Sequence, residues 1–112
     1  MALLRTPDER RSESRHSANA RGIIVTPSLE MACLIIDQSD GGLRVRTDRS
    51  VFLPSVVTIV DVAAGTACEA EVAWRQGHEA GLKCRVRATA LRGLVPARFA
   101  QAREAWLRAG GR

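Results

Sequence analysis

Apolar and polar residues alternate with a period of two along the middle of this chain, and short turns interrupt the alternation at close intervals. In the segment AGLKCRV (80–86), for example, Leu82 and Cys84 alternate with Lys83 and Arg85. Successive side chains of a strand point to opposite faces, so this segment reads as a strand with one buried and one solvated face. The pattern predicts an antiparallel all-β fold.

Six short segments between residues 22 and 86 read as strands, namely 22–26, 31–36, 43–47, 56–62, 67–75 and 80–86, and the alternation is seen in 43–47, 67–75 and 80–86. Turn-forming residues separate them, among them Pro27, Gly65 and Gly77. Six strands in about 65 residues leave little material for two sheets, so we expect a six-stranded antiparallel β-barrel rather than a sandwich. Trp74 continues the alternation on the side of Cys68, and we expect it in the core.

The C-terminal segment changes to a helical period. Its apolar residues step by four, three, four and three positions, and they are Val95, Phe99, Ala102, Trp106 and Ala109. This spacing places them on one side of a helix. Pro96 fits the first turn and Gly110 the stop. We expect this helix to pack on the barrel, which would cover Phe99 and Trp106; packing on another chain is the alternative.

Residues 1–21 are polar and charged without an apolar period, and they carry Arg5, Arg10, Arg11, Arg15 and Arg21. This composition is typical of a flexible leader. The sequence therefore predicts three parts: a basic leader (1–21), a β-barrel (22–93), and a helix with a short tail (94–112).

Charge and composition narrow the classes of partner and compartment. The chain has 112 residues and a net charge of +5, and among its 17 basic residues only Lys83 is a lysine. A basic balance favours an anionic partner, and arginine suits phosphates and ring stacking. The sequence has neither a signal peptide core nor the ~20 apolar residues of a membrane span. We expect a cytoplasmic protein.

Known catalytic and metal-binding patterns are absent from the sequence. Ser39 does not lie in a GxSxG elbow, and the glycine-rich loops GxxxxGK and GxGxxG do not occur. The three cysteines, Cys33, Cys68 and Cys84, show no CxxC spacing and read as small core residues in a reducing compartment. We therefore expect neither an enzyme nor a metal site.

Two short motifs remain. The stretch DQSDGG (37–42) lies between two predicted strands and reads as a turn. It contains Asp37, Ser39 and Gly42 in the spacing DxSxxG, about twenty residues after Arg11 and Arg15 in the spacing RxxxR. In this order and context, the chain resembles the PilZ family, bacterial receptors for cyclic di-GMP. The resemblance runs from about Arg10 to Cys84 and includes the late hairpin AEVAWRQGHEAGLKC.

The resemblance implies a PilZ-type barrel that binds cyclic di-GMP through Arg11, Arg15, Asp37, Ser39 and Gly42, without a cofactor. Arg meets guanine O6 and N7 bidentately and also forks onto phosphate, while a carboxylate accepts from the N1–H and N2–H₂ edge. Family resemblance assigns Asp37 and Ser39 to base recognition on the outer face of the barrel. Gly42 lets a ligand or a loop approach closely.

The resemblance also implies a mode of signalling. Arg10 precedes the motif at a place that the family associates with binding a stacked dimer of the nucleotide. The leader would fold over the ligand and report its state to a protein partner that controls motility, secretion or surface behaviour.

Two other functions stay open from the residues alone. One is a basic small barrel that binds nucleic acid, which the charge favours; the absence of Tyr and the few aromatic residues argue against it. The other is a ligand-free interaction protein with the PilZ fold, against which the intact RxxxR and DxSxxG motifs argue.

Overall fold

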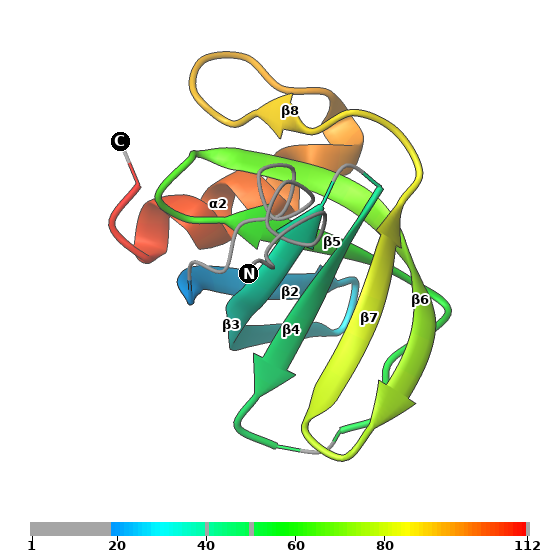
Figure 1. Ribbon diagram of the computed structural model, residues 1–112. Helices are drawn as coiled ribbons and strands as arrows, with labels where there is room; N and C mark the ends of the chain where they lie inside the picture. Colours follow the sequence, from blue (N-terminus) through cyan, green and yellow to red (C-terminus); the bar gives the residue numbers. More distant parts are fainter. Residues whose placement is uncertain (1–18, 40, 50, 112) are drawn as a thin grey trace, which may run out of the picture.

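The six predicted strands form a closed barrel in the computed structural model of the chain, which describes residues 19–39, 41–49 and 51–111 (Figure 1). Neighbouring strands are antiparallel and follow the order β5-β2-β3-β4-β7-β6, and β6 pairs with β5 to close the barrel. The all-β fold class and its six-stranded antiparallel barrel are thus confirmed. The strands are β2 (Ala20–Thr26), β3 (Leu29–Ser39), β4 (Gly42–Thr47), β5 (Val56–Asp61), β6 (Thr66–Gln76) and β7 (Glu79–Cys84).

The inward residues of these strands fill the barrel. Along β3, Met31, Cys33 and Ile35 are buried while the residues between them are exposed, because successive side chains of a strand point to opposite faces. The interior is made of small and branched side chains, including Ile24, Val45, Val57, Ile59, Ala70, Ala80 and Leu82.

The C-terminal elements cover one side of the barrel. A short strand, β8 (Thr89–Ala90), pairs with β6 and leads through a 3₁₀ turn, η2 (Ala97–Phe99), into helix α2 (Ala100–Arg108). Helix α2 lies against β2 and β5 (Figure 1). Phe99 and Trp106 are fully buried there in a second apolar cluster. The helix therefore packs on the barrel, as expected. Among the described residues, neither helix is long and apolar enough to cross a bilayer.

The stretch DQSDGG is not a six-residue turn, so this sequence prediction is wrong. Strand β3 continues through Asp37 to Ser39, and Ser39 pairs with Gly42, which leaves a connection of two residues. A register shift between Ile35 and Asp37 makes a β-bulge within β3. The bulge lets the strand run on in pairing with β4 while its side chains change face.

Trp74 is not a core residue, which corrects a second sequence prediction. It is 42% exposed, and its indole ring lies over Gly81 of β7. The cause is another register shift, between Val72 and Trp74 in β6. A bulge adds one residue, so Trp74 moves from the inner face, which the alternation assigned to it, to the outer face.

Candidate functional site on the outer face of the barrel

The two bulges bring residues from four strands into one row on the outer face. Asp37 pairs with Arg44, Arg44 pairs with Gly81, and Gly81 pairs with Trp74. Directly opposed residues of antiparallel strands share a face of the sheet. Because Arg44 is exposed, the face that these four positions share is the outer one. Without the bulge in β3, Asp37 would share the inward face of Ile35.

Ser39 lies in the next row of the same face, opposite Gly42, which in turn pairs with Lys83. A Cβ at position 42 would lie 2.9 Å from the carbonyl oxygen of Leu82. The backbone of β7 therefore lies so close to position 42 that only glycine fits there. Gly42 thus holds β4 against β7 directly beside Ser39.

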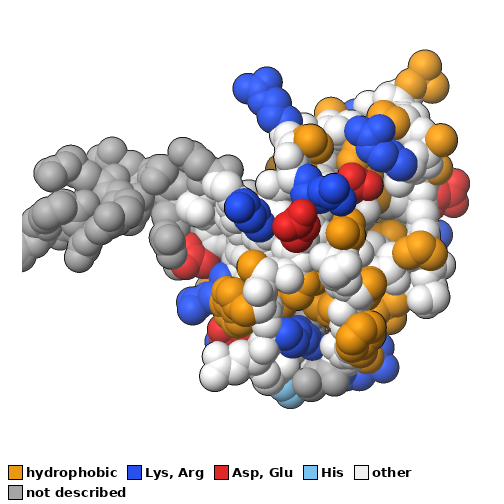
Figure 2. Space-filling model, turned by 90° about the vertical axis from the view of Figure 1, so that its right-hand side faces the viewer, with side chains coloured by type: hydrophobic (Ala, Val, Ile, Leu, Met, Phe, Trp, Pro, Cys, Tyr) orange, Lys and Arg blue, Asp and Glu red, His pale blue; other side chains and the backbone are white. Residues whose placement is uncertain are grey.

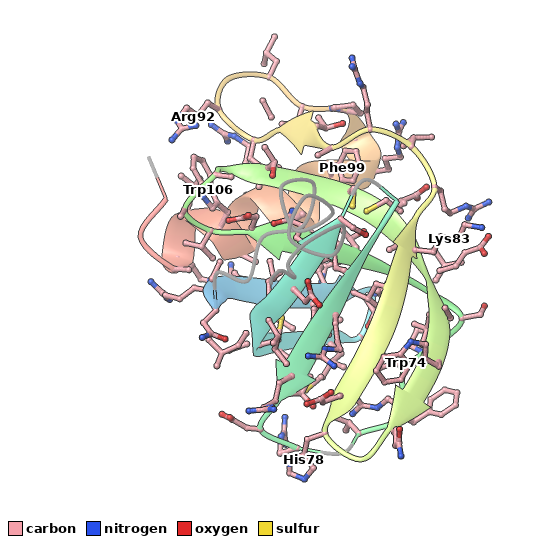
Figure 3. All side chains as sticks on the ribbon, in the orientation of Figure 1. Trp74, His78, Lys83, Arg92, Phe99 and Trp106 are labelled. Carbon is pink, nitrogen blue, oxygen red and sulfur yellow. The ribbon has the colours of Figure 1, made fainter. Side chains whose placement is uncertain are left out.

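These rows enclose a hollow of about 290 Å³, which we call the outer-face hollow. Gly81 contributes to its floor, because a Cβ at this position would overlap the indole ring of Trp74. In Figure 3, Trp74 reaches across from β6 toward β7. The hollow is lined by Asp37, Gln38, Ser39, Gly42, Leu43, Arg44, Ala73, Trp74, Gly81 and Leu82.

Charged side chains of both signs surround the hollow. Arg46 donates to Glu79 Oε2 at 2.8 Å, and the Arg44 guanidinium lies 3.9 Å from Glu79 Oε1. The hydrogen bond from Arg46 is the main reason that the pKa of the Glu79 carboxyl lies below its usual value, and the charge of Arg44 adds to it. Figure 2, which views the side of β6 and β7, shows Lys and Arg side chains interspersed with acidic and hydrophobic ones.

Chemically, the outer-face hollow offers a carboxylate, a hydroxyl, a guanidinium and an aromatic face within one surface. This set matches a ligand with a flat ring, hydrogen-bond donors on its edge and a negative charge. In the described part of the chain, no group of three His, Cys, Asp or Glu side chains is arranged to hold a metal ion.

The sequence motif DxSxxG is brought together at this hollow, since Asp37, Ser39 and Gly42 all line it. Arg10, Arg11 and Arg15 lie outside the described residues. Sequence reasoning placed Trp74 in the core and did not single out Arg44 for the site. The signal that could have revealed Trp74 is Gly81, a glycine within a strand just across the hairpin, which leaves room for a large ring.

A comparison with family models identifies the domain. The model of the PilZ domain matches residues 9–95, more than three quarters of the 112-residue chain. The chain belongs to the PilZ family. The match spans both motifs of this PilZ domain, including the three arginines outside the described residues. PilZ domains generally bind cyclic di-GMP and are typically non-catalytic receptors. No curated protein and no solved structure matched the chain.

Proposed function

We propose that this PilZ protein is a receptor for cyclic di-GMP and binds the nucleotide at the outer-face hollow. One observation carries the proposal: Asp37 and Ser39 share this outward surface with Arg44 and Trp74. The proposed ligand is a second messenger, so the proposal includes a non-catalytic role and a cytoplasmic location.

The chemistry of guanine supports the assignment of each side chain. The base presents N–H donors on its Watson–Crick edge, for which the Asp37 carboxylate is the acceptor, with Ser39 beside it. The O6 and N7 acceptors on its other edge suit an Arg, as do the two phosphates, and Arg44 is the nearest described candidate. Trp74 supplies a face on which a base stacks, a contact that contributes about 1–3 kcal/mol.

The arginines of the leader complete the proposed site. A hollow of about 290 Å³ is at the lower end of ligand-binding sites, which span roughly 300–1,000 Å³, so further groups are needed to enclose a dinucleotide. In the proposal, Arg11 and Arg15 bind phosphate and guanine from the open side, and Arg10 holds a second, stacked nucleotide. The conformation of the leader would then change with ligand and be read by a protein partner.

Isothermal titration of the full chain with cyclic di-GMP tests this proposal. We expect binding at micromolar ligand or tighter, and a rise in the melting temperature. Arg11→Ala and Arg15→Ala should each weaken binding about tenfold or more, a loss of roughly 1.4 kcal/mol per decade. Arg10→Ala should reduce the stoichiometry from two nucleotides per chain to one.

Arg87→Ala is the matched control, since it removes the same charge from an exposed position outside the hollow. Its affinity should equal that of the unmodified chain. The absence of both heat and stabilisation with a folded protein would overturn the proposal. A gel shift with nucleic acid that is steep in salt and insensitive to cyclic di-GMP would instead favour a nucleic-acid-binding barrel.

A further inference from the structure

Two cysteines meet near one end of the barrel, beside the β3–β4 hairpin, and neither of them lines the outer-face hollow. Cys68 lies on β6 and Cys84 ends β7, and Cys84 pairs with Ala70, so the two cysteines are diagonal neighbours. Their Sγ atoms are 2.8 Å apart and both thiols are free. This is closer than two sulfur atoms approach by ordinary packing.

The two thiols differ in exposure and acidity. Cys68 is 5% exposed, whereas Cys84 is only half-buried. The two sulfurs share a hydrogen bond in which either thiol can be the donor, and this bond lowers the pKa of the Cys84 thiol to about 7. The same hydrogen bond, followed by burial, raises the pKa of Cys68. Cys84 is therefore the more accessible and the more acidic thiol, with Cys68 buried behind it, the arrangement found in oxidisable cysteine pairs.

We propose that Cys68 and Cys84 form an oxidation site at which a hydroperoxide produces an intrachain disulfide. The Cys84 thiolate attacks one peroxide oxygen and the O–O bond breaks, so that the other oxygen leaves with a proton as alcohol or water. Cys84 is then a sulfenic acid. The Cys68 sulfur attacks the Cys84 sulfur and loses its proton, and the S–O bond breaks to release water. Two thiols are oxidised by two electrons and one peroxide is reduced by two.

The barrel holds the pair close to the bonded geometry. The sulfurs need to move from 2.8 Å to the roughly 2.05 Å of an S–S bond. The backbones on either side are already paired, because the Arg85 N–H donates to the Glu69 carbonyl at 2.9 Å. The bond would also form beside the β3–β4 hairpin, since the Cys84 N–H donates to the Gly41 carbonyl at 3.1 Å. The inference does not depend on nucleotide binding.

Mass spectrometry of the full chain treated with hydrogen peroxide tests this inference. We expect the intact mass to fall by two hydrogen atoms and to return after reduction. Trypsin cleaves after Arg49, Arg75, Lys83 and Arg85, so the unreduced digest should contain peptide 50–75 linked to the dipeptide 84–85. Cys33 lies in a different peptide, 22–44, and should remain a thiol.

Variants and a pH profile separate this site from a pair of packed thiols. Cys68→Ala and Cys84→Ala should abolish the mass loss, while Cys33→Ala should retain it. In the untreated protein, iodoacetamide labelling of Cys84 should increase as pH rises through about 7, because the thiolate reacts. Burial raises the pKa of Cys33 to about 12, so its labelling near neutral pH should be slower by roughly tenfold or more.

Peroxide treatment of the unmodified chain tests the proposed disulfide by itself, even if a cysteine variant fails to fold. A peroxide-treated protein whose Cys84 carries oxygen without a link to Cys68 would overturn it. Linkage through Cys33, or between chains, would do the same.

Discussion

Trp74 presents much more apolar surface to water than the other tryptophan: 42% of the residue is exposed, against 1% for Trp106. The exposed part of an indole ring contributes little to folding, because apolar surface stabilises the folded state only when it is removed from water. A guanine base stacked on the ring would remove much of this surface from solvent. The proposed role of Trp74 is therefore in binding rather than in stability.

Replacing Trp74 with Ala should weaken cyclic di-GMP binding roughly five- to 150-fold, the equivalent of the 1–3 kcal/mol of a base–aromatic stack. The free energy of unfolding should fall by less than it does for the fully buried Trp106, because 42% of Trp74 is already exposed. Titration calorimetry and chemical denaturation measure the two effects.

Phe52→Ala provides a matched control for Trp74. Phe52 is 87% exposed and does not line the outer-face hollow, so its removal should leave affinity unchanged. Equal losses in the two variants would mean that exposed aromatic residues act without regard to the hollow, which contradicts the proposed site.

At the scale of the strands, the hollow depends on two bulges and two glycines. Each bulge exchanges the faces of the residues that follow it, and each glycine allows backbone or ring to approach. Gly42 is the sharper case, since a Cβ there would lie 2.9 Å from a backbone oxygen that has little freedom to move.

Gly42→Ala should lower the free energy of unfolding by roughly 1–3 kcal/mol, as overpacking does, and should also weaken nucleotide binding by displacing β4 from β7. Gly41→Ala is the control, because a Cβ at position 41 meets nothing within 4 Å. It should alter stability by no more than about 0.5 kcal/mol. Guanidinium denaturation compares the two variants, and similar stabilities would show that the contact of Gly42 with Leu82 is unimportant.

The strands themselves were predictable from sequence, whereas their bulges were not. Segment 31–36 is apolar throughout, so the sequence predicts a strand there but not that Met31, Cys33 and Ile35 are the buried residues. The bulge before Asp37 was missed, because one extra residue reverses the faces of a strand, and such a reversal leaves no local trace that distinguishes it from a turn. Trp74 was misassigned for the same reason. The motif DxSxxG nevertheless located the hollow, since a family pattern carries information that periodicity lacks.

At the scale of the molecule, the described residues form two apolar cores, one inside the barrel and one between the barrel and helix α2. Trp106 anchors the second core, and its Nε1–H donates to the Val62 carbonyl at 2.9 Å. The helix is short, nine residues, so most of its stability has to come from this packing. The helical period of the sequence predicted which side of the helix is buried. That this side packs on β2 and β5 could not be predicted, because it depends on the order of the strands in the closed barrel.

Trp106→Ala should therefore lower the free energy of unfolding by roughly 3–5 kcal/mol. Leu107→Ala removes the neighbouring side chain, which is 42% exposed, and should cost less than about 1 kcal/mol. Denaturation followed by far-ultraviolet circular dichroism compares them. Equal effects would contradict the assignment of the second core.

The central claim, that cyclic di-GMP binds on the face shared by β3, β4, β7 and β6, is tested most directly by nuclear magnetic resonance of the ¹⁵N-labelled chain. Its two tryptophans give two indole N–H signals, which a Trp74→Phe variant assigns. On addition of cyclic di-GMP, the Trp74 indole and the amides of Ser39, Gly42 and Gly81 should shift, while the Trp106 indole stays in place. Binding that leaves these signals unchanged, or that moves only signals elsewhere on the barrel, would contradict the account.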